Sequence, residues 1–214
     1  MQTIFKRATD FYNSYADSLT AGYTLSPKPS SKGGHNLLWS IFDAKSSPSE
    51  KVSIFILEKQ SLKEEILAKL RLEPKNLAKF RHPNILRIIE PLRENSYQMV
   101  FVTERVKFSL AYLFDKKQVE TDFPSELNTK IGFLDLFTAI KFLHFTTKSL
   151  HLNISPCSIY ITEKSQWKLA GFQCLVPINS QKKSEFDFNE DKIEIGGKIA
   201  NILPDLRFSA PELI

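Results

Sequence analysis

Short apolar runs alternate with polar turns over the first half of the chain. The runs at Leu37 to Phe42, Val52 to Leu57 and Met99 to Val102 have the length and apolar content of strands. A polar stretch with a proline separates the first two runs, which predicts that they pair as a hairpin. Residues 61–80 are rich in Leu, Lys and Glu and favour a helix. Pro74 predicts a kink or a restart there, because proline lacks an N–H donor.

A helical repeat replaces this pattern after residue 103. Apolar residues in the segment 128–145 follow at intervals of three, at Ile131, Leu134, Phe137, Ile140 and Leu143. More apolar residues widen this stripe, so the segment predicts a strongly buried helix. Two strand-like pieces follow at Ile159 to Thr162 and Trp167 to Ala170. Strands with one helix before a helical region predict an α+β fold, in which a small β-rich lobe precedes a helical lobe.

The first 24 residues are predicted to be an N-terminal extension. Apolar and aromatic residues at nearly helical spacing predict a short amphipathic helix in residues 1–22. Such a helix packs on its own domain or lies on a membrane surface, and Lys6 and Arg7 alone are weak support for the second role. A turn-rich stretch at 26–36 separates this extension from the first strand.

Composition narrows the class of protein further. The 214 residues are 42% hydrophobic and 25% charged, which is typical of a globular chain. The net charge of +5 is dispersed, which favours a mildly basic surface over a nucleic-acid site. Two cysteines, Cys157 and Cys174, build neither a disulfide framework nor a zinc site. Without an apolar run of membrane-spanning length or a signal peptide, the chain is expected in the cytoplasm.

Several short motifs follow one another in the order found in protein kinases. They are Arg81-His82-Pro83-Asn84-Ile85-Leu86, His151-Leu152-Asn153-Ile154-Ser155-Pro156-Cys157-Ser158, Gly171-Phe172-Gln173 and Ser209-Ala210-Pro211-Glu212. They resemble the turn after the regulatory helix, the catalytic loop, the Asp-Phe-Gly motif and the close of the activation segment. The resemblance implies a protein-kinase-like fold. It has an extension at 1–24, an N-lobe at 25–104 and a partial C-lobe at 105–214, truncated after the activation segment.

Other details resemble one family in particular, the SCY-like pseudokinases, and within it the clathrin-vesicle-associated branch. The shared traits are Gly33-Gly34 before Trp39, Val52-Ser53-Ile54-Phe55, Thr103-Glu104, His151 with Asn153, and Trp167-Lys168 before Gly171-Phe172. The resemblance implies a cytoplasmic scaffold in vesicle or protein trafficking. Its partners would be trafficking proteins or vesicle coat and adaptor components, without nucleic acid. Peripheral association with the cytoplasmic face of vesicle, Golgi or endosomal membranes is a further implication.

Four positions lack the groups that phosphoryl transfer requires. Phe55 replaces the phosphate-binding lysine and cannot offer a cation. Asn153 replaces the catalytic aspartate, and an amide has no basic site near neutral pH. Ser158 and Gly171 replace the two Mg²⁺ ligands, where a hard cation prefers carboxylate oxygens. No catalytic residue, metal site or cofactor is therefore expected.

ATP binding without normal Mg²⁺ coordination remains an alternative, and with it an atypical kinase or a nucleotide-dependent switch. If nucleotide binds, the resemblance places it at Gly33, Gly34, Thr103 and Glu104. Only one of the three glycines of a phosphate loop is present, since the aligned residues are Ser31, Gly33 and Asn36. A glycine pair in a hairpin is more typical of an ordinary turn.

Three other features allow two interpretations each. Glu73 could be the helix glutamate of kinases, but without its lysine it is expected to be a surface carboxylate. Lys59 is expected to point to solvent rather than replace that lysine. The acidic and aromatic segment at 185–191 is either a docking peptide for a trafficking adaptor or a solvated loop.

Overall fold

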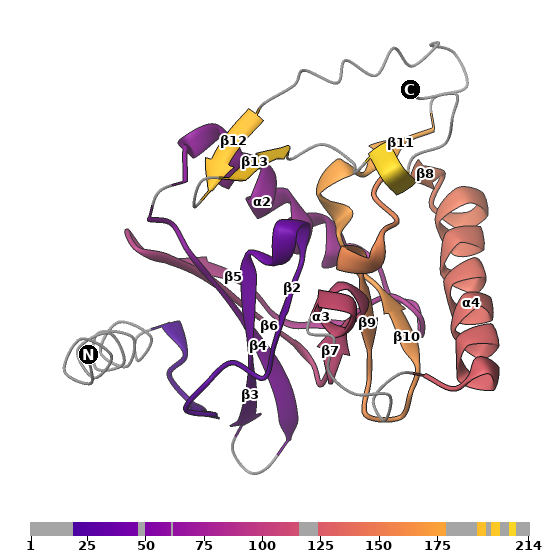
Figure 1. Cartoon of the computed structure of the whole chain (residues 1–214), viewed down its shortest axis with the longest axis horizontal. Coiled ribbons are helices and arrows are strands. Elements are labelled where there is room, and N and C mark those ends of the chain that lie inside the picture. The colour runs from indigo at the N-terminus through magenta and orange to yellow at the C-terminus, as the bar shows by residue number, and fades with distance from the viewer. Residues whose placement is uncertain are drawn as a thin grey trace.

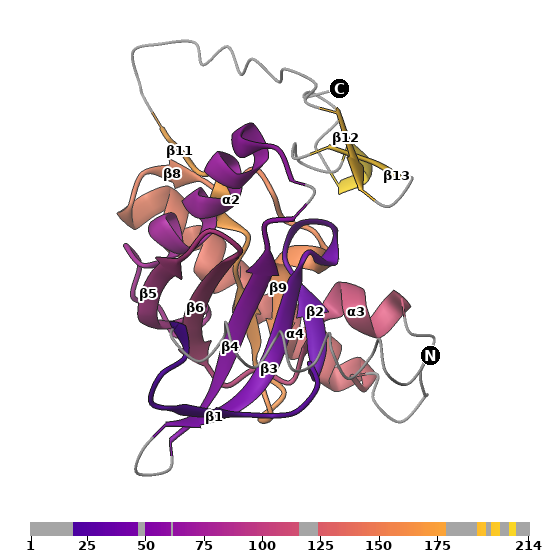
Figure 2. The same ribbon diagram turned by 90° about the vertical axis from the view of Figure 1, so that its left-hand side faces the viewer.

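The first lobe is an antiparallel sheet crossed by one helix. The computed structural model describes residues 19–46, 50–60, 62–115, 124–178, 192–195, 198–201 and 206–208 (Figure 1). The strands of this lobe are β1 (Tyr23–Leu25), β2 (Ser31–Gly33), β3 (Trp39–Ser46), β4 (Lys51–Glu58), β5 (Ile88–Glu94) and β6 (Gln98–Glu104). They are ordered β1-β3-β4-β6-β5, with β2 also paired to β3, and Figure 2 faces this sheet. The predicted hairpin is β3 with β4, and the third predicted run is β6.

Both faces of the sheet are buried at its centre, where most positions of β4 and β6 are apolar. One face belongs to the main core, with Trp39, Phe55 and Phe101. The opposite face forms a smaller cluster around Ile54 and Val102, which the segment before β1 helps to cover. Strands buried on both sides read as continuous apolar runs rather than as an alternation, which is the pattern seen in the sequence.

Helix α2 (Glu64–Leu77) runs through Pro74 as one element, so the predicted kink or restart is wrong. Pro74 lies in the last turn, where its missing N–H removes a single hydrogen bond. The N–H of Ala78 still donates to the Pro74 carbonyl at 3.0 Å, which closes that turn. Two glutamates in the first turn suit the positive end of the helix dipole.

The second lobe combines helices with short strands. Its elements are β7 (Phe108–Ser109), α3 (Leu110–Asp115), α4 (Glu126–Lys141), a π-helical turn (Phe142–Thr146), β8 (Ser149–Leu150), β9 (Ile159–Ile161), β10 (Trp167–Leu169), β11 (Val176–Pro177), β12 (Lys192–Ile195) and β13 (Lys198–Asn201). Short 3-10 turns lie at His35–Leu37, Pro156–Ser158, Phe172–Cys174 and Leu206–Phe208. The two strand-like pieces predicted after the long helix are β9 and β10, which pair antiparallel.

Helix α4 is less buried than its apolar pattern predicts. Ser125 caps it by accepting a hydrogen bond from the N–H of Asn128. Its covered side packs on β10, where Gly132 leaves room for the Trp167 ring. Apolar side chains on its other sides are exposed among the described residues, namely Leu127, Ile131, Phe133, Leu134 and Phe137. Periodicity identifies an apolar face but does not say whether another element covers it.

The two lobes share one continuous core. Ile85, in the loop after α2, forms a parallel bridge with Leu169 of β10. The N–H of Leu86 donates to the Leu169 carbonyl at 2.9 Å, and the N–H of Leu169 donates to the Asn84 carbonyl at 2.8 Å. The fold is protein-kinase-like, with a β-rich first lobe and part of a helical second lobe. The predictions on residues 1–18, 185–191 and 209–212 lie outside the described residues. Within the described ranges, no helix has both the length and the apolarity to cross a bilayer.

Candidate functional site

The interlobe seam, where β4 of the first lobe meets β9 of the second, is filled by aromatic rings. Phe55 stacks on Phe101 with ring centroids 4.7 Å apart and meets Tyr160 edge-on at 5.4 Å. Trp39 meets Phe101 edge-on at 4.9 Å. All four rings are at most 1% exposed. Hydrocarbon therefore occupies the strand position at which a kinase presents its phosphate-binding ammonium group.

The glycine pair fits closely around these rings. A Cβ atom added to Gly33 would overlap the Tyr160 hydroxyl, and one added to Gly34 would overlap the Trp39 indole. Gly34 also has a φ of +66°, a conformation that favours glycine. The structure thus brings Gly33 and Gly34 to the predicted loop, but there they accommodate aromatic side chains of the protein itself.

The backbone at Thr103 and Glu104 is already hydrogen-bonded within the protein. The N–H of Glu104 donates to the Arg87 carbonyl at 3.0 Å. The buried Thr103 hydroxyl donates to the Glu104 carbonyl at 2.9 Å. Two residues on, the N–H of Val106 donates to the Ser53 hydroxyl oxygen at 3.0 Å. An adenine ring would have to displace such internal bonds to bind these groups.

Glu73 is buried, so the expectation of a surface carboxylate is wrong. It is 1% exposed, and its Oε1 accepts a hydrogen bond of 3.1 Å from the N–H of Gly171. Burial raises the pKa of Glu73 to about 7, although the N–H groups of Gly171 and Trp39 act in the opposite direction. Because Phe55 stands where a lysine would pair with it, the carboxylate instead joins α2 to the segment that begins at Gly171.

Asn153, Ser158 and Gly171 lie together and hold one another. The Asn153 amide donates to the Gly171 carbonyl at 3.2 Å. The Ser158 hydroxyl donates to the Ser155 carbonyl at 2.9 Å and accepts from the Ser155 N–H at 3.0 Å, which caps the short turn there. Gly171 has a φ of +79°, and a Cβ at that position would lie 2.5 Å from Cβ of Ser158. The Asn153 and Ser158 side chains are therefore engaged in local structure, and Gly171 leaves the space that they need.

His151 and Asn76 hold the backbone on either side of Gly171, and Phe172 is buried there. The Nε2 atom of His151 lies 2.9 Å from the Ala170 carbonyl, and burial lowers the pKa of His151 to about 4. A neutral imidazole with Nε2 protonated fits this contact, so the described contacts of His151 are structural. Phe172 is fully buried, and the Asn76 amide donates to its carbonyl at 2.9 Å.

Lys59 is not directed freely to solvent, contrary to expectation. Its ammonium group pairs with Glu94 at 2.7 Å and donates to the Asn95 carbonyl at 2.6 Å. Its side chain is 14% exposed. The ammonium group of Lys59 is thus bound by the β5–β6 hairpin, and Lys59 does not replace the missing strand lysine.

Comparison with known proteins identifies the family of this chain. No protein-family model matches the chain. Protein kinase-like protein SCY1 of Saccharomyces cerevisiae is 34% identical over 193 aligned positions, and the match covers 75% of this chain and 24% of that protein. SCY1-like protein 2 of Homo sapiens is 29% identical over 201 aligned positions, and the match covers 85% of this chain and 21% of that protein. The chain belongs to the SCY1-like family of protein-kinase-like proteins.

A more distant likeness extends to an enzyme. CBL-interacting serine/threonine-protein kinase 19 of Arabidopsis thaliana is 28% identical over 141 residues, 65% of this chain and 28% of that protein. The SCY1-like chain spans about a quarter of the length of the curated relatives that it matches.

A buried lysine completes the site of the SCY1-like chain. Lys168 is 6% exposed, donates to the Pro83 carbonyl at 2.5 Å and lies 3.3 Å from the Glu104 carboxylate. It thereby ties β10 to the loop after α2 and to the end of β6. The sequence singled out Lys168 only as part of a motif. In the sequence, Lys168 lies between the apolar residues Trp167 and Leu169. That position indicates burial, and a buried ammonium group needs an anionic partner.

The described side chains of the site are engaged mainly with one another and with backbone groups. Among the described residues, no three His, Cys, Asp or Glu side chains gather where they could hold a metal ion. The buried carboxylate, Glu73, is engaged by backbone and lies beside aromatic rings. These contacts hold the two lobes together, with Phe55 at the strand position and Asn153 in the loop.

Proposed function

We propose that this chain is a catalytically inactive kinase-like domain, which acts as a scaffold in intracellular vesicle or protein trafficking. The observation that carries the first half is the ring of Phe55, packed between Phe101 and Tyr160 where a cation is needed. Positioned cations and metal ions supply nearly all of the catalysis in phosphoryl transfer. Asn153, whose amide donates to the Gly171 carbonyl, cannot act as a general base, because an amide has no basic site near neutral pH.

The trafficking role is supported by membership of the SCY1-like family and not by a feature of the site. Its partners would be trafficking proteins or vesicle coat and adaptor components, met in the cytoplasm or on the cytoplasmic face of vesicle, Golgi or endosomal membranes. We expect the full-length protein to co-precipitate with a coat adaptor from cytosol, and its kinase-like domain to contribute to that binding. Loss of the domain without any effect on co-precipitation would contradict this role.

A phosphotransfer assay tests the lack of activity directly. The purified chain is incubated with radiolabelled ATP, a generic substrate protein and either Mg²⁺ or Mn²⁺. No incorporation above that of the buffer is expected. Robust incorporation that disappears in Asn153→Ala would overturn the proposal, because it would assign catalysis to this loop.

The alternative is a domain that binds ATP, as an atypical kinase or a nucleotide-dependent switch. The likeness to an Arabidopsis serine/threonine-protein kinase is the observation in its favour. A ligand that binds the folded state raises the melting temperature by mass action. We expect no rise at millimolar ATP with or without Mg²⁺, because the aromatic rings fill the seam and Val106 is already bonded to Ser53. A saturable rise would favour the switch.

A further inference from the structure

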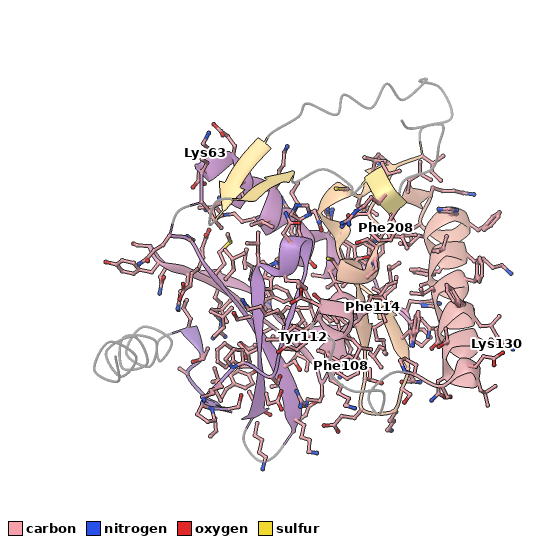
Figure 3. All side chains as sticks on the ribbon, in the orientation of Figure 1. Lys63, Phe108, Tyr112, Phe114, Lys130 and Phe208 are labelled. Carbon is pink, nitrogen blue, oxygen red and sulfur yellow. The ribbon has the colours of Figure 1, made fainter. Side chains whose placement is uncertain are left out.

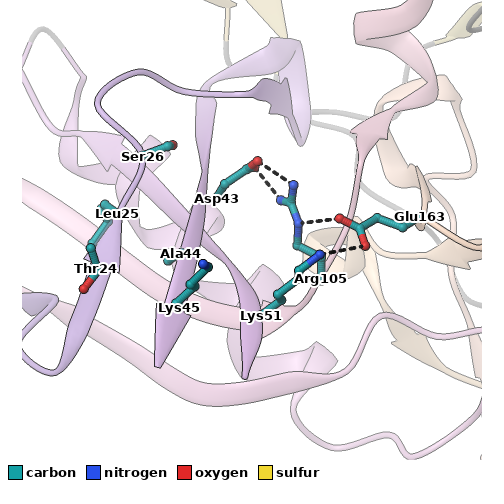
Figure 4. A pocket seen from close by; sticks show the side chains of 9 residues that line it. All are labelled: Thr24, Leu25, Ser26, Asp43, Ala44, Lys45, Lys51, Arg105 and Glu163. Carbon is teal, nitrogen blue, oxygen red and sulfur yellow. Dashed lines mark hydrogen bonds and ion pairs between the residues drawn. The ribbon is translucent and has the colours of Figure 1, made fainter. Parts of the chain in front are cut away.

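A hollow of about 410 Å³ opens beside the end of β6, away from the aromatic rings of the interlobe seam (Figure 4). Five separate segments of the chain line it. The lining residues are Thr24, Leu25, Ser26, Asp43, Ala44, Lys45, Lys51, Arg105 and Glu163. Its volume lies in the range of small-molecule sites, and nothing in the proposed scaffold role makes use of it.

The two carboxylates of the hollow are already paired. Both terminal nitrogens of Arg105 bind the two oxygens of Asp43, and its Nε lies 3.4 Å from the Glu163 carboxylate. The Arg105 side chain is 18% exposed, so this fork is a fixed part of the wall. Planar two-point pairing of this kind holds both partners in place.

Two lysines leave the hollow with an excess of positive charge. Lys51 lies 3.7 Å from Glu163, a carboxylate that Arg105 also engages, and its side chain is 63% exposed. Lys45 has no acidic partner in the described part of the chain. Three cations thus face two carboxylates, and Figure 4 shows both lysines on the wall between Leu25 and Arg105.

The other lining groups suit a ligand with an anionic end and a carbon skeleton. The Ser26 hydroxyl donates to the Lys28 carbonyl at 2.8 Å, so its position is set. The Thr24 hydroxyl lies on the neighbouring strand β1 and can donate to an anion. Thr24, Lys45 and Lys51 are paired across β1, β3 and β4, so they lie on one face of the sheet, while Leu25 and Ala44 line the hollow from the apolar cluster behind it. Lysine binds phosphate as a point charge, and a dianion interacts with two lysines more strongly than a monoanion does.

We propose that this hollow binds a small ligand that carries a phosphate monoester. The same chemistry occurs in soluble sugar or glycerol phosphates and in the headgroup of a monoester phospholipid. The ligand would touch β1, β3 and β4 of the first lobe and Glu163 of the second lobe at once. The proposal is independent of whether the interlobe seam binds ATP.

Glycerol 3-phosphate and lipid vesicles serve as probes of the whole chain. Calorimetric titration measures binding of the soluble ester. Flotation compares phosphatidylcholine vesicles that contain phosphatidic acid, a monoester, with vesicles that contain phosphatidylglycerol, a diester. We expect saturable binding to the monoester form and weaker binding to the diester. Binding to glycerol 3-phosphate identifies a soluble source, whereas binding to phosphatidic acid vesicles alone identifies the lipid.

Two variants and a matched control locate the site. Lys45→Gln with Lys51→Gln should weaken binding at least about fivefold, since two exposed ion pairs each contribute modestly. Lys63→Gln with Lys130→Gln removes the same charge from exposed lysines of other elements, labelled in Figure 3, and should leave affinity unchanged. Thr24→Trp fills the hollow without changing charge and should also weaken binding.

Three results would overturn the proposal. They are an equal loss in the control pair, full affinity in Thr24→Trp, and the absence of binding to either form of the monoester. Circular dichroism of each variant shows that the fold is kept. Because Lys45 and Thr24 are exposed, no folding defect is expected from replacing them.

Discussion

Replacing the buried carboxylate of Glu73 by an amide should change how stability depends on pH. Glu73 is 1% exposed, and burial raises its pKa from 4.5 to about 7. A raised pKa means that the folded state prefers the protonated form. The stability from this group is therefore complete below the unfolded pKa and is lost as pH rises to the folded value. The shift corresponds to about 3 kcal/mol, at roughly 1.4 kcal/mol for each pKa unit.

Glu73→Gln keeps the shape and an acceptor for the N–H of Gly171 but cannot ionise. The free energy of unfolding, from urea titrations between about pH 5 and about pH 8, should therefore shift in favour of the variant by up to about 3 kcal/mol as pH rises. Other titrating groups cancel in the difference between the two proteins, including the buried His151. Glu65→Gln, on an exposed position of the same helix, is the control and should show no such trend. A constant difference between wild type and Glu73→Gln across this range would refute the reasoning.

Three other substitutions test the site. Gly171→Asp should not restore phosphotransfer in the radiolabel assay and should lower stability by about 2 kcal/mol or more, because of its positive φ and its crowded neighbours; a stable or active variant would contradict this. Asn153→Asp should destabilise the fold in urea, because a buried carboxylate would face the Gly171 carbonyl. A gain in stability would show that the hydrogen bond from the Asn153 side-chain amide does not stabilise the fold. Lys168→Met should cost about 3 kcal/mol in unfolding, since it leaves Glu104 without its buried partner, and an unchanged urea midpoint would exclude that pairing.

Much of the fold followed from the sequence because it is local. The runs that became β3, β4 and β6 have apolar residues on both faces, which identified these strands, although β3 begins two residues later and ends four residues later than its predicted run. Motif order singled out Asn153 and Gly171, and the structure brings these two residues into contact. These features depend on neighbours in the chain and on spacing, which a single sequence contains.

Other features could not be read in this way, because they depend on what faces a side chain across space. Glu73 is buried because Trp39 and the start of the Gly171 segment close over α2, and neither is near it in sequence. Ile131 on α4 shows the converse, since its apolar side remains exposed among the described residues. Lys59 was misassigned for the same reason, because its partner Glu94 is on another strand. Pairing between distant charges leaves no periodic signal.

The hydrogen bond between Ser53 and Val106 bears on inhibitor chemistry. Compounds that imitate adenine gain affinity from unpaired backbone donors and acceptors. Here the N–H of Val106 donates to the Ser53 hydroxyl oxygen, which lies 3.3 Å from the Val106 carbonyl oxygen. A flat heteroaromatic compound would have to break these contacts and expel the Tyr160 ring before it gained any of its own. Libraries built around kinase hinges should therefore give few hits against this domain, and a selective compound would have to be sought on another face of the protein.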